Sequence, residues 1–117
     1  MDKMKKYAKL LREILTEYKE LDAKATNSDI QINDDSVFVF DEASGVFAWF
    51  GFGWTKQGRI RAMRVFTRLH EGKIHIEEDW TEEGIGTILL ARGVPPKDIV
   101  IEFHPPEMRQ YTEFAIS

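Results

Sequence analysis

Four strand-like runs separated by three short turns, the first two runs rich in valine and aromatic residues, constrain the fold more than any other feature of the chain. The runs occupy residues 37–41, 46–54, 59–69 and 74–79, and the turns occupy residues 42–45, 55–58 and 70–73. Each turn contains a glycine, which is Gly45, Gly58 or Gly72. Such runs joined by short glycine-containing turns predict β-hairpins, so we expect an antiparallel meander. A weaker signal at residues 29–33 extends the prediction to four to five strands.

The segment before these runs has the apolar period of a helix. Between residues 2 and 22, apolar side chains recur at alternating three- and four-residue steps, as Met4, Tyr7, Leu11, Ile14, Tyr18 and Leu21. This stripe predicts an amphipathic helix that packs on the sheet. The first turns carry Lys3, Lys5, Lys6 and Lys9. Their charge opposes the positive end of the helix dipole, so packing is expected to hold the helix in place.

A second helix is predicted after the last run, and a final strand follows it. Thr81 is a suitable N-cap, and the two glutamates after it suit the positive end of the helix dipole. Gly93 stands where a left-handed residue ends a helix. Residues 99–103 are an apolar strand before the C-terminal tail. The fold class is therefore α+β: a long N-terminal helix, the antiparallel meander, a short second helix, and a C-terminal strand and tail. We expect a single domain over residues 1–117.

The composition excludes several kinds of chemistry. The chain has 117 residues and no cysteine, which rules out disulfides, thiolate metal sites and cysteine nucleophiles. A formal net charge of −4 makes it a poor general binder of DNA, because such binding depends on neutralising phosphates. No apolar stretch reaches the length of a membrane span, and the N-terminus has no signal core. We therefore expect a cytoplasmic protein with no membrane partner.

The third run carries the obvious candidates for a nucleic-acid interface, which are Arg59, Arg61, Arg64 and Arg68. Counting outward from the turns gives each arginine a partner within the chain. Trp54 is expected opposite Arg59, Phe52 opposite Arg61, and Asp79 opposite Arg64. His75 is expected opposite Arg68, with Glu77 on the diagonal as its ion-pair partner. Ion pairs and cation–π contacts of this kind are routine within a sheet. A structural role is therefore favoured, and phosphate binding by the arginines stays the alternative.

His75, Glu77 and Asp79 alternate along the fourth run, so they are expected to point to one face of its strand. One histidine with two exposed acids is not a closed ligand set, and any outward polar strand face has the same pattern. The serines lie in linkers, turns or at the terminus, and none stands in a nucleophile motif. We therefore predict no metal, no cofactor and no catalytic residue.

Residues 46–54 are apolar on both faces of their strand. The N-terminal helix can cover one of these faces. The other face also needs a cover, and a partner protein is a natural one. The oligomeric state stays open, a homodimer included.

The last third of the chain carries a series of short motifs. They are Gly72-Lys73-Ile74, Asp79-x-Thr81-Glu82-x-Gly84-Ile85, Gly93-Val94-Pro95, Asp98-Ile99-Val100, Phe103-His104-x-Pro106 and Arg109-x-Tyr111-Thr112-x-Phe114-Ala115. In their order and spacing, and together with Phe40-Asp41, Gly53-Trp54 and Arg59, they resemble the XisI-like family, the fdxN element excision controlling factors. The resemblance covers nearly the whole chain, although Phe66 and His75 stand where the family commonly has histidine and tryptophan.

The resemblance implies a non-enzymatic accessory factor for programmed excision of a DNA element in cyanobacteria. It implies action through a companion protein, XisH, and an indirect association with a site-specific recombinase and DNA. The residues expected to bind the companion all come from the matched motifs: Trp54, Arg59, Asp79, Thr81, Glu82, His104, Arg109 and Thr112. In the tail, we expect Tyr111, Phe114 and Ile116 to pack on the domain and to leave His104 and Arg109 accessible.

Two alternatives from other functional classes stay open. The first is a DNA-binding directionality factor that uses the arginine-rich strand, through Arg59, Arg61, Arg64 and Arg68. The second is a small-molecule or metal-dependent enzyme centred on Asp79, His104 and Arg109. The sequence does not specify which DNA element is involved.

Overall fold

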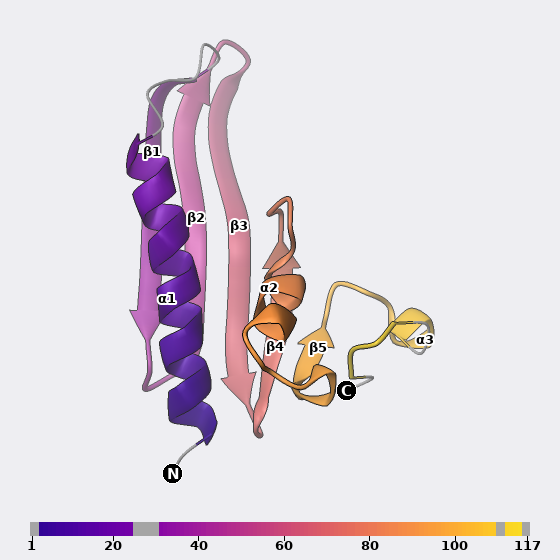
Figure 1. Ribbon diagram of the computed structural model, residues 1–117. Helices are drawn as coiled ribbons and strands as arrows, with labels where there is room; N and C mark the ends of the chain where they lie inside the picture. Colours follow the sequence, from indigo (N-terminus) through magenta and orange to yellow (C-terminus); the bar gives the residue numbers. More distant parts are fainter. Residues whose placement is uncertain (1–2, 25–30, 110–111, 116–117) are drawn as a thin grey trace.

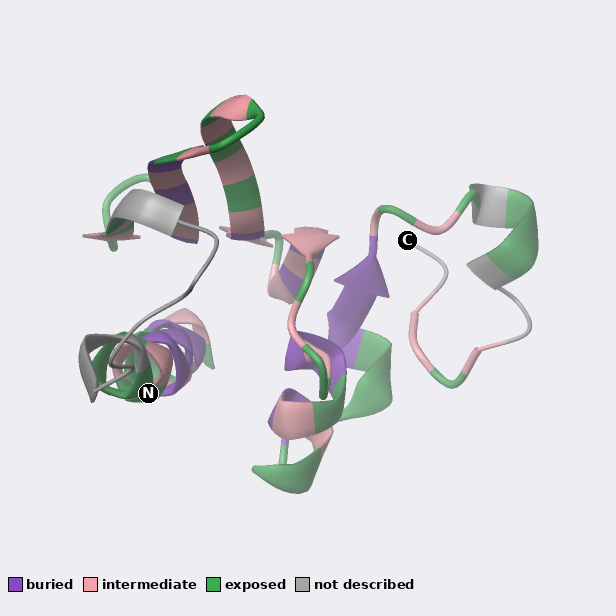
Figure 2. Cartoon of the chain, turned by 90° about the horizontal axis from the view of Figure 1, so that it is seen from above, coloured by how far each residue is buried: buried purple, intermediate pink, exposed green. Residues whose placement is uncertain are grey.

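A five-stranded sheet forms the centre of the molecule, and two helices lie on one of its faces (Figure 1; Figure 2). The computed structural model describes residues 3–24, 31–109 and 112–115. In chain order the elements are α1 (Lys3–Lys24), β1 (Gln31–Asp41), β2 (Val46–Thr55), β3 (Gly58–His70), β4 (Lys73–Asp79), α2 (Ile85–Ala91), the 3-10 turn η1 (Pro96–Asp98), β5 (Ile99–Ile101) and α3 (Pro106–Arg109). None of the helices among these residues is long and apolar enough to cross a membrane.

The strands lie in the sheet in sequence order, β1-β2-β3-β4-β5. The first four form the antiparallel meander that the turns predict. β5 runs parallel to β4, because α2 carries the chain back along the sheet before β5 begins. β1 includes residues 31–33 of the weak strand signal, whereas residues 29 and 30 lie outside the described residues. β5 is shorter than predicted and ends at Ile101, where the His104 N–H donates to Ile101 O at 3.2 Å and turns the chain.

The core lies between the helices and one face of the sheet. α1 contributes Tyr7, Leu11, Ile14 and Leu15, the sheet contributes Phe47, Val65, Ile74 and Ile76, and α2 contributes Ile85 and Leu89. All of these side chains are buried. The first turn of α1 carries no acidic residue. Because the apolar stripe of α1 packs against the sheet, the predicted amphipathic helix is confirmed.

A β-bulge makes Arg64 an extra residue in β3. Trp49 of β2 pairs with Val65, but the next residue, Phe50, pairs with Met63. Arg64 therefore turns to the helix-covered face, where its Cζ lies 5.5 Å from the centre of the Trp49 ring. The bulge adds a residue to one strand only, so it changes which arginines share a face.

A second bulge makes Glu77 an extra residue in β4. Because of this bulge, two predictions from the sequence are wrong. Asp79 pairs with Val65, so the predicted cross-strand pair of Asp79 with Arg64 is wrong. Asp79 also turns to the helix-covered face, whereas Glu77 stays on the other face. The prediction that His75, Glu77 and Asp79 share one face is therefore wrong, because the extra residue breaks the strand alternation.

The C-terminal segment docks beside β5. Ala115 forms a parallel bridge with Val100, and the Ala115 N–H donates to Ile99 O at 2.9 Å. Phe114 packs beside Gly86, where an added Cβ would stand 3.1 Å from the ring. The predicted packing of the tail is confirmed for Phe114. The predictions for Tyr111 and Ile116 fall outside the described residues.

Candidate functional site

The turn between β4 and α2 is organised by the carboxylate of Asp79. Its Oδ1 accepts hydrogen bonds from the backbone N–H and the hydroxyl of Thr81, at 2.9 and 2.6 Å. Its Oδ2 accepts a hydrogen bond of 2.6 Å from the N–H of Ile85, the first residue of α2. Thr81 Oγ1 in turn accepts from the Gly84 N–H at 3.1 Å. We call residues 79–85 the junction, and its shape depends on Asp79.

The structure corrects the predicted start of α2. The N-cap is Gly84, whose φ is 90°, so Thr81 is not the cap and the helix begins at Ile85. The two glutamates, Glu82 and Glu83, precede the helix and are exposed. The physical reason is that the Asp79 carboxylate, a charged acceptor, already satisfies the first N–H of the helix.

The predicted end of α2 is confirmed. Gly93 has a φ of 97°, in the left-handed region that favours glycine. Its N–H donates to Leu90 O, and the Val94 N–H donates to Leu89 O, both at 3.1 Å. These two bonds are those of a Schellman motif. The junction and this motif together fix the length of α2 and its place beside α1.

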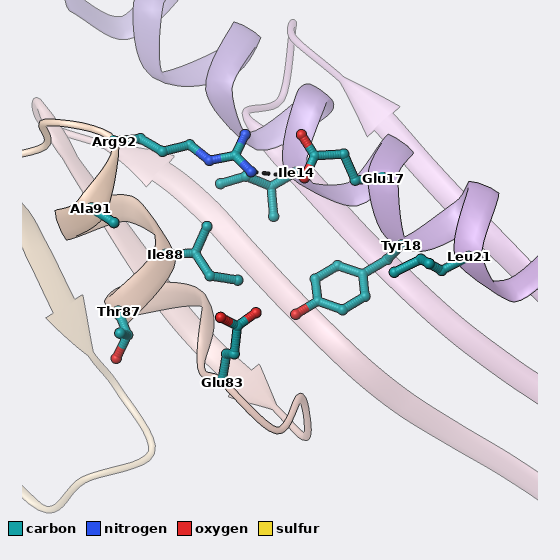
Figure 3. A pocket seen from close by; sticks show the side chains of 9 residues that line it. All are labelled: Ile14, Glu17, Tyr18, Leu21, Glu83, Thr87, Ile88, Ala91 and Arg92. Carbon is teal, nitrogen blue, oxygen red and sulfur yellow. Dashed lines mark hydrogen bonds and ion pairs between the residues drawn. The ribbon is translucent and has the colours of Figure 1, made fainter.

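A groove of about 300 Å³ runs between α1 and α2 next to the junction (Figure 3). α1 lines it with Ile14, Glu17, Tyr18 and Leu21, and the junction and α2 line it with Glu83, Thr87, Ile88, Ala91 and Arg92. Its floor is apolar, because Ile14 is buried there and Ile88 is half-buried. Leu21 is 64% exposed. This α1–α2 groove therefore offers apolar surface to a binding partner.

Charged and polar groups form the rim of the groove. Arg92 Nη2 donates to Glu17 Oε1 at 2.7 Å and so links α2 to α1. The hydrogen bond from Arg92 lowers the pKa of Glu17, and it raises the pKa of Arg92. The Tyr18 hydroxyl points toward the Glu83 carboxylate (Figure 3), and burial raises the pKa of Tyr18. Glu83 adds negative charge at this end of the rim.

Behind Tyr18 lies a cluster that sequence reasoning missed. The Tyr18 ring stacks on Trp49 with a centroid distance of 5.5 Å, and Arg64 lies over the same indole. Trp49 Nε1 and Arg64 Nε are buried and have no hydrogen-bond partner in the described part of the chain. Gly51 makes room for Arg64, because an added Cβ would stand 2.6 Å from Arg64 Nε. In the sequence, the sign of this cluster was Gly51, a glycine between aromatic residues of β2.

The residues predicted to bind a companion fall in three separate places. Trp54 and Arg59 lie at the β2–β3 turn, Asp79, Thr81 and Glu82 lie in the junction, and His104 and Thr112 lie in the segments around α3 (Figure 1). The side chain of Arg109 lies outside the described residues. The structure brings Arg59 over the Trp54 ring, at 5.5 Å, and Asp79 against Thr81. Arg59 and Val65, the β3 partner of Asp79, are about 20 Å apart along the strand, so the pair at the β2–β3 turn lies apart from the junction.

The arginines of β3 are also divided. The predicted register of Arg59 with Trp54 and of Arg61 with Phe52 is confirmed. The guanidinium of Arg59 lies over the Trp54 ring, as predicted, and it also lies 6.0 Å from the centre of the Phe52 ring. Arg68 is held by Glu77, as predicted, because its Nε and Nη2 both donate to Glu77 Oε2, at 3.0 and 2.7 Å. Arg64 lies on the helix-covered face of the sheet, over Trp49. The four guanidinium groups therefore do not form one continuous basic strip.

The histidine of β4 is engaged away from Asp79. His75 Nδ1 lies 2.7 Å from Glu102 Oε2, and this contact joins β4 to the end of β5. His104 packs edge-on against the Phe103 ring at 5.0 Å. Over residues 3–24, 31–109 and 112–115, no group of three or more His, Cys, Asp or Glu side chains could hold a metal ion.

A buried carboxylate, which sequence reasoning also missed, fastens α1 to η1. Asp98 is 5% exposed, accepts a hydrogen bond of 2.6 Å from the Tyr7 hydroxyl and pairs with Lys3 Nζ at 3.3 Å. Burial acts to raise the pKa of Asp98, but the hydrogen bonds from Tyr7 and Lys3 outweigh it and lower this pKa. Burial, aided by the bond to Asp98, raises the pKa of Tyr7 to about 12. The Asp98-Ile99-Val100 motif was the sequence signal for this contact.

These features define a class of small α+β protein, in which a mostly antiparallel sheet carries helices on one face and leaves the other face open. The model of the XisI protein family matches residues 1–116, and the chain belongs to this family. The resemblance inferred from the sequence motifs is thereby confirmed. No match to the chain was found among curated proteins.

Two solved structures from Anabaena variabilis ATCC 29413 share the fold. A XisI-like protein is 25% identical in sequence, with a TM-score of 0.82 over 97% of this chain and 99% of that chain. The fdxN element excision controlling factor XisI is 31% identical, with a TM-score of 0.82 over 99% of this chain and 100% of that chain. The predicted arrangement of N-terminal helix, meander, second helix and C-terminal strand is therefore that of the XisI-like structures.

Proposed function

We propose that this protein is a non-enzymatic accessory factor that controls the excision of a DNA element and acts by binding a companion protein of the XisH type. Membership of the XisI family supports the excision role, as does the similarity to an fdxN element excision controlling factor. In this proposal the protein works in the cytoplasm as one domain over residues 1–117. It meets a site-specific recombinase and DNA indirectly, through the companion.

The observation that carries the binding role is the α1–α2 groove beside the junction. Leu21 and Ile88 offer apolar contact, while the exposed Glu83 places a carboxylate at the rim. This combination complements a lysine or arginine of a partner protein, because such side chains have an apolar stem and a charged tip. The hydrogen bonds of Asp79 hold the junction in shape before binding, which reduces the entropy lost on binding.

The state of Asp79 supports an accessory role over the enzymatic alternative. Both of its carboxylate oxygens accept hydrogen bonds from its own loop, from Thr81 and from Ile85. A general base needs an oxygen within hydrogen-bond reach of the substrate proton that it removes. The Asp79 oxygens instead accept hydrogen bonds that shape the junction and the start of α2. None of these hydrogen bonds comes from His104, the second residue of that alternative.

Co-expression with the companion protein, followed by size-exclusion chromatography at micromolar concentration, tests the proposal. We expect one co-eluting complex from the unmodified chain. Leu21→Asp and Glu83→Lys should each weaken the complex by about tenfold or more, because they remove the apolar contact and reverse the rim charge. Glu42→Lys, the same charge change in the exposed β1–β2 turn, is the matched control and should leave binding intact. Separate elution of the unmodified chain and the companion would contradict the proposal.

A further inference from the structure

Within the described residues, no helix covers the face of the sheet opposite α1 and α2, and we call this apolar face the open face. α1 and α2 both lie on the other side (Figure 1; Figure 2). The open face carries the large apolar side chains Val37, Phe50, Phe52, Trp54, Met63 and Phe66. Val37 and Met63 are each 43% exposed, and Trp54 is 48% exposed. The rings of Phe50 and Phe52 lie 6.5 Å apart, and those of Phe50 and Phe66 lie 6.4 Å apart. A contiguous exposed patch of this kind marks an interaction surface.

The cross-strand rows of this face are symmetric about β2. In one row Phe52 of β2 stands between Asp35 of β1 and Arg61 of β3, so the two ends of the row carry opposite charges. Asp35 and Arg61 are both exposed. Because their strands flank β2 on either side, they are separated by two interstrand spacings, or about 10 Å. No ion pair joins the Asp35 and Arg61 side chains of one chain in the part that the structure describes.

The neighbouring rows are apolar at both ends. Phe50 of β2 stands between Val37 and Met63. In the row after the bulge, Ala48 stands between Val39 and Phe66. Each of these three rows therefore has ends that complement each other, by charge in one row and by apolar contact in two rows.

We propose that a second copy of this chain packs on the open face through a two-fold axis parallel to β2. This operation places β1 of each copy over β3 of the other. Asp35 of each copy then faces Arg61 of the other, Val37 faces Met63, and Phe50 and Phe52 pack near the axis. An interface of this kind uses the same patch on both copies, as closed dimers do. It keeps the strands of the two sheets within the range of about 30° that aligned sheet packing shows.

The charges on the open face favour a protein occupant over a nucleic acid. Glu77 holds the Arg68 guanidinium at 2.7 Å, and Asp35 and Glu78 place further negative charge on this face. A nucleic-acid surface needs unneutralised positive charge along its length. The dimer does not depend on the proposed function, because the α1–α2 groove lies on the other side of the sheet.

Analytical ultracentrifugation of the unmodified chain at micromolar concentration is the first test. We expect the mass of two chains. Met63→Asp should give a single chain at the same concentration, because it places carboxylates against Val37 of the partner copy. Leu21→Asp makes a comparable change at a more exposed apolar residue on the helix side, and it should leave the dimer intact. A single-chain mass for the unmodified protein, or a dimer that survives Met63→Asp, would overturn the proposal.

A charge swap tests the two-fold axis itself. Asp35→Arg and Arg61→Asp should each weaken dimerisation by about tenfold, because each sets like charges opposite each other twice in the dimer. The double variant Asp35→Arg/Arg61→Asp should restore the affinity, since opposite charges face each other again. Circular dichroism of each variant checks that it is folded. A double variant that dimerises no better than the two single variants rejects this axis. Binding of single-stranded DNA to a single chain, if Phe50→Ala abolishes that binding, would also reject the dimer, because the DNA would then occupy the open face.

Discussion

The two faces of β2 use alternate residues of one strand for different purposes. On the helix-covered face, Phe47 is fully buried and Trp49 packs against Tyr18 of α1. On the open face, the Phe50 ring lies beside those of Phe52 and Phe66, and no described helix covers these rings. The covered face therefore supplies the stability of a single chain. The open face contributes less to it and is available for contact between chains, and comparing substitutions on the two faces separates these roles.

The largest difference is expected between Phe47→Ala and Met63→Ala. Phe47 is fully buried between the sheet and α1, so its truncation should lower the free energy of unfolding by about 3–5 kcal/mol. Met63 is 43% exposed on the open face, so its truncation should cost less than about 1 kcal/mol. Urea denaturation at a concentration low enough to keep the chain monomeric measures both. Equal losses would show that the two faces do not differ as described.

A smaller effect is expected at the junction, which belongs to the covered side. Asp79→Ala leaves the N–H groups of Thr81 and Ile85 without their acceptor and should cost about 2–3 kcal/mol. Thr81→Ala removes one side-chain bond to Asp79 and the acceptor for Gly84, and should cost about 1 kcal/mol. Thermal melting of both variants shows which substitution lowers stability more. A larger loss for Thr81→Ala would restore Thr81 as the residue that starts α2.

The pH dependence of stability should report the buried contact between Tyr7 and Asp98. The pKa of Asp98 is below its ordinary value of 3.8, so its contribution is complete above pH 3.8 and is lost as the pH falls further. The pKa of Tyr7 rises from 10.0 to about 12, so stability should also decline as the pH rises through this window.

Tyr7→Phe should cost about 2 kcal/mol near neutral pH, because it removes a buried hydrogen bond to a charged group. It should also abolish the alkaline decline that Tyr7 causes. Asp98→Asn is the matched control, which should remove the acid-dependent component instead. Urea denaturation across the pH range measures both, and an unchanged alkaline decline in Tyr7→Phe would show that the decline arises elsewhere.

The smallest expected effect is on the binding of duplex DNA by the chain alone. The guanidinium groups of β3 lie on two faces, and Glu77 holds that of Arg68. The chain alone should therefore show no appreciable binding of duplex DNA at physiological salt in a mobility-shift titration. Sub-micromolar affinity that disappears in Arg59→Ala/Arg61→Ala would favour the directionality-factor alternative, because these two arginines share the open face.

Sequence reasoning succeeded where the deciding signal is local. The stripe of α1 and the turns at Gly45, Gly58 and Gly72 predicted the helix and the meander, and Gly93 predicted the end of α2. Each of these features depends on neighbouring residues along the chain. The family motifs likewise predicted the fold that the solved relatives share.

Sequence reasoning failed where a contact between two secondary-structure elements decides the outcome. The bulges at Arg64 and Glu77 arise from pairing between strands, and a one-residue shift exchanges the faces of every residue beyond it. The start of α2 was misplaced because Asp79, at the end of β4, supplies the acceptor that was assigned to Thr81. The parallel direction of β5 and the bond between Tyr7 and Asp98 likewise join segments that are far apart in sequence.

The open face and the α1–α2 groove are proposed to bind different partners. The most direct test is the mass of the complex formed by Met63→Asp and the companion protein, measured by light scattering after size-exclusion chromatography. We expect the companion to stay bound to Met63→Asp in a complex that contains only one copy of this chain. The unmodified chain should give a complex with two copies. Loss of the companion from Met63→Asp would contradict the account, because it would show that the companion itself occupies the open face.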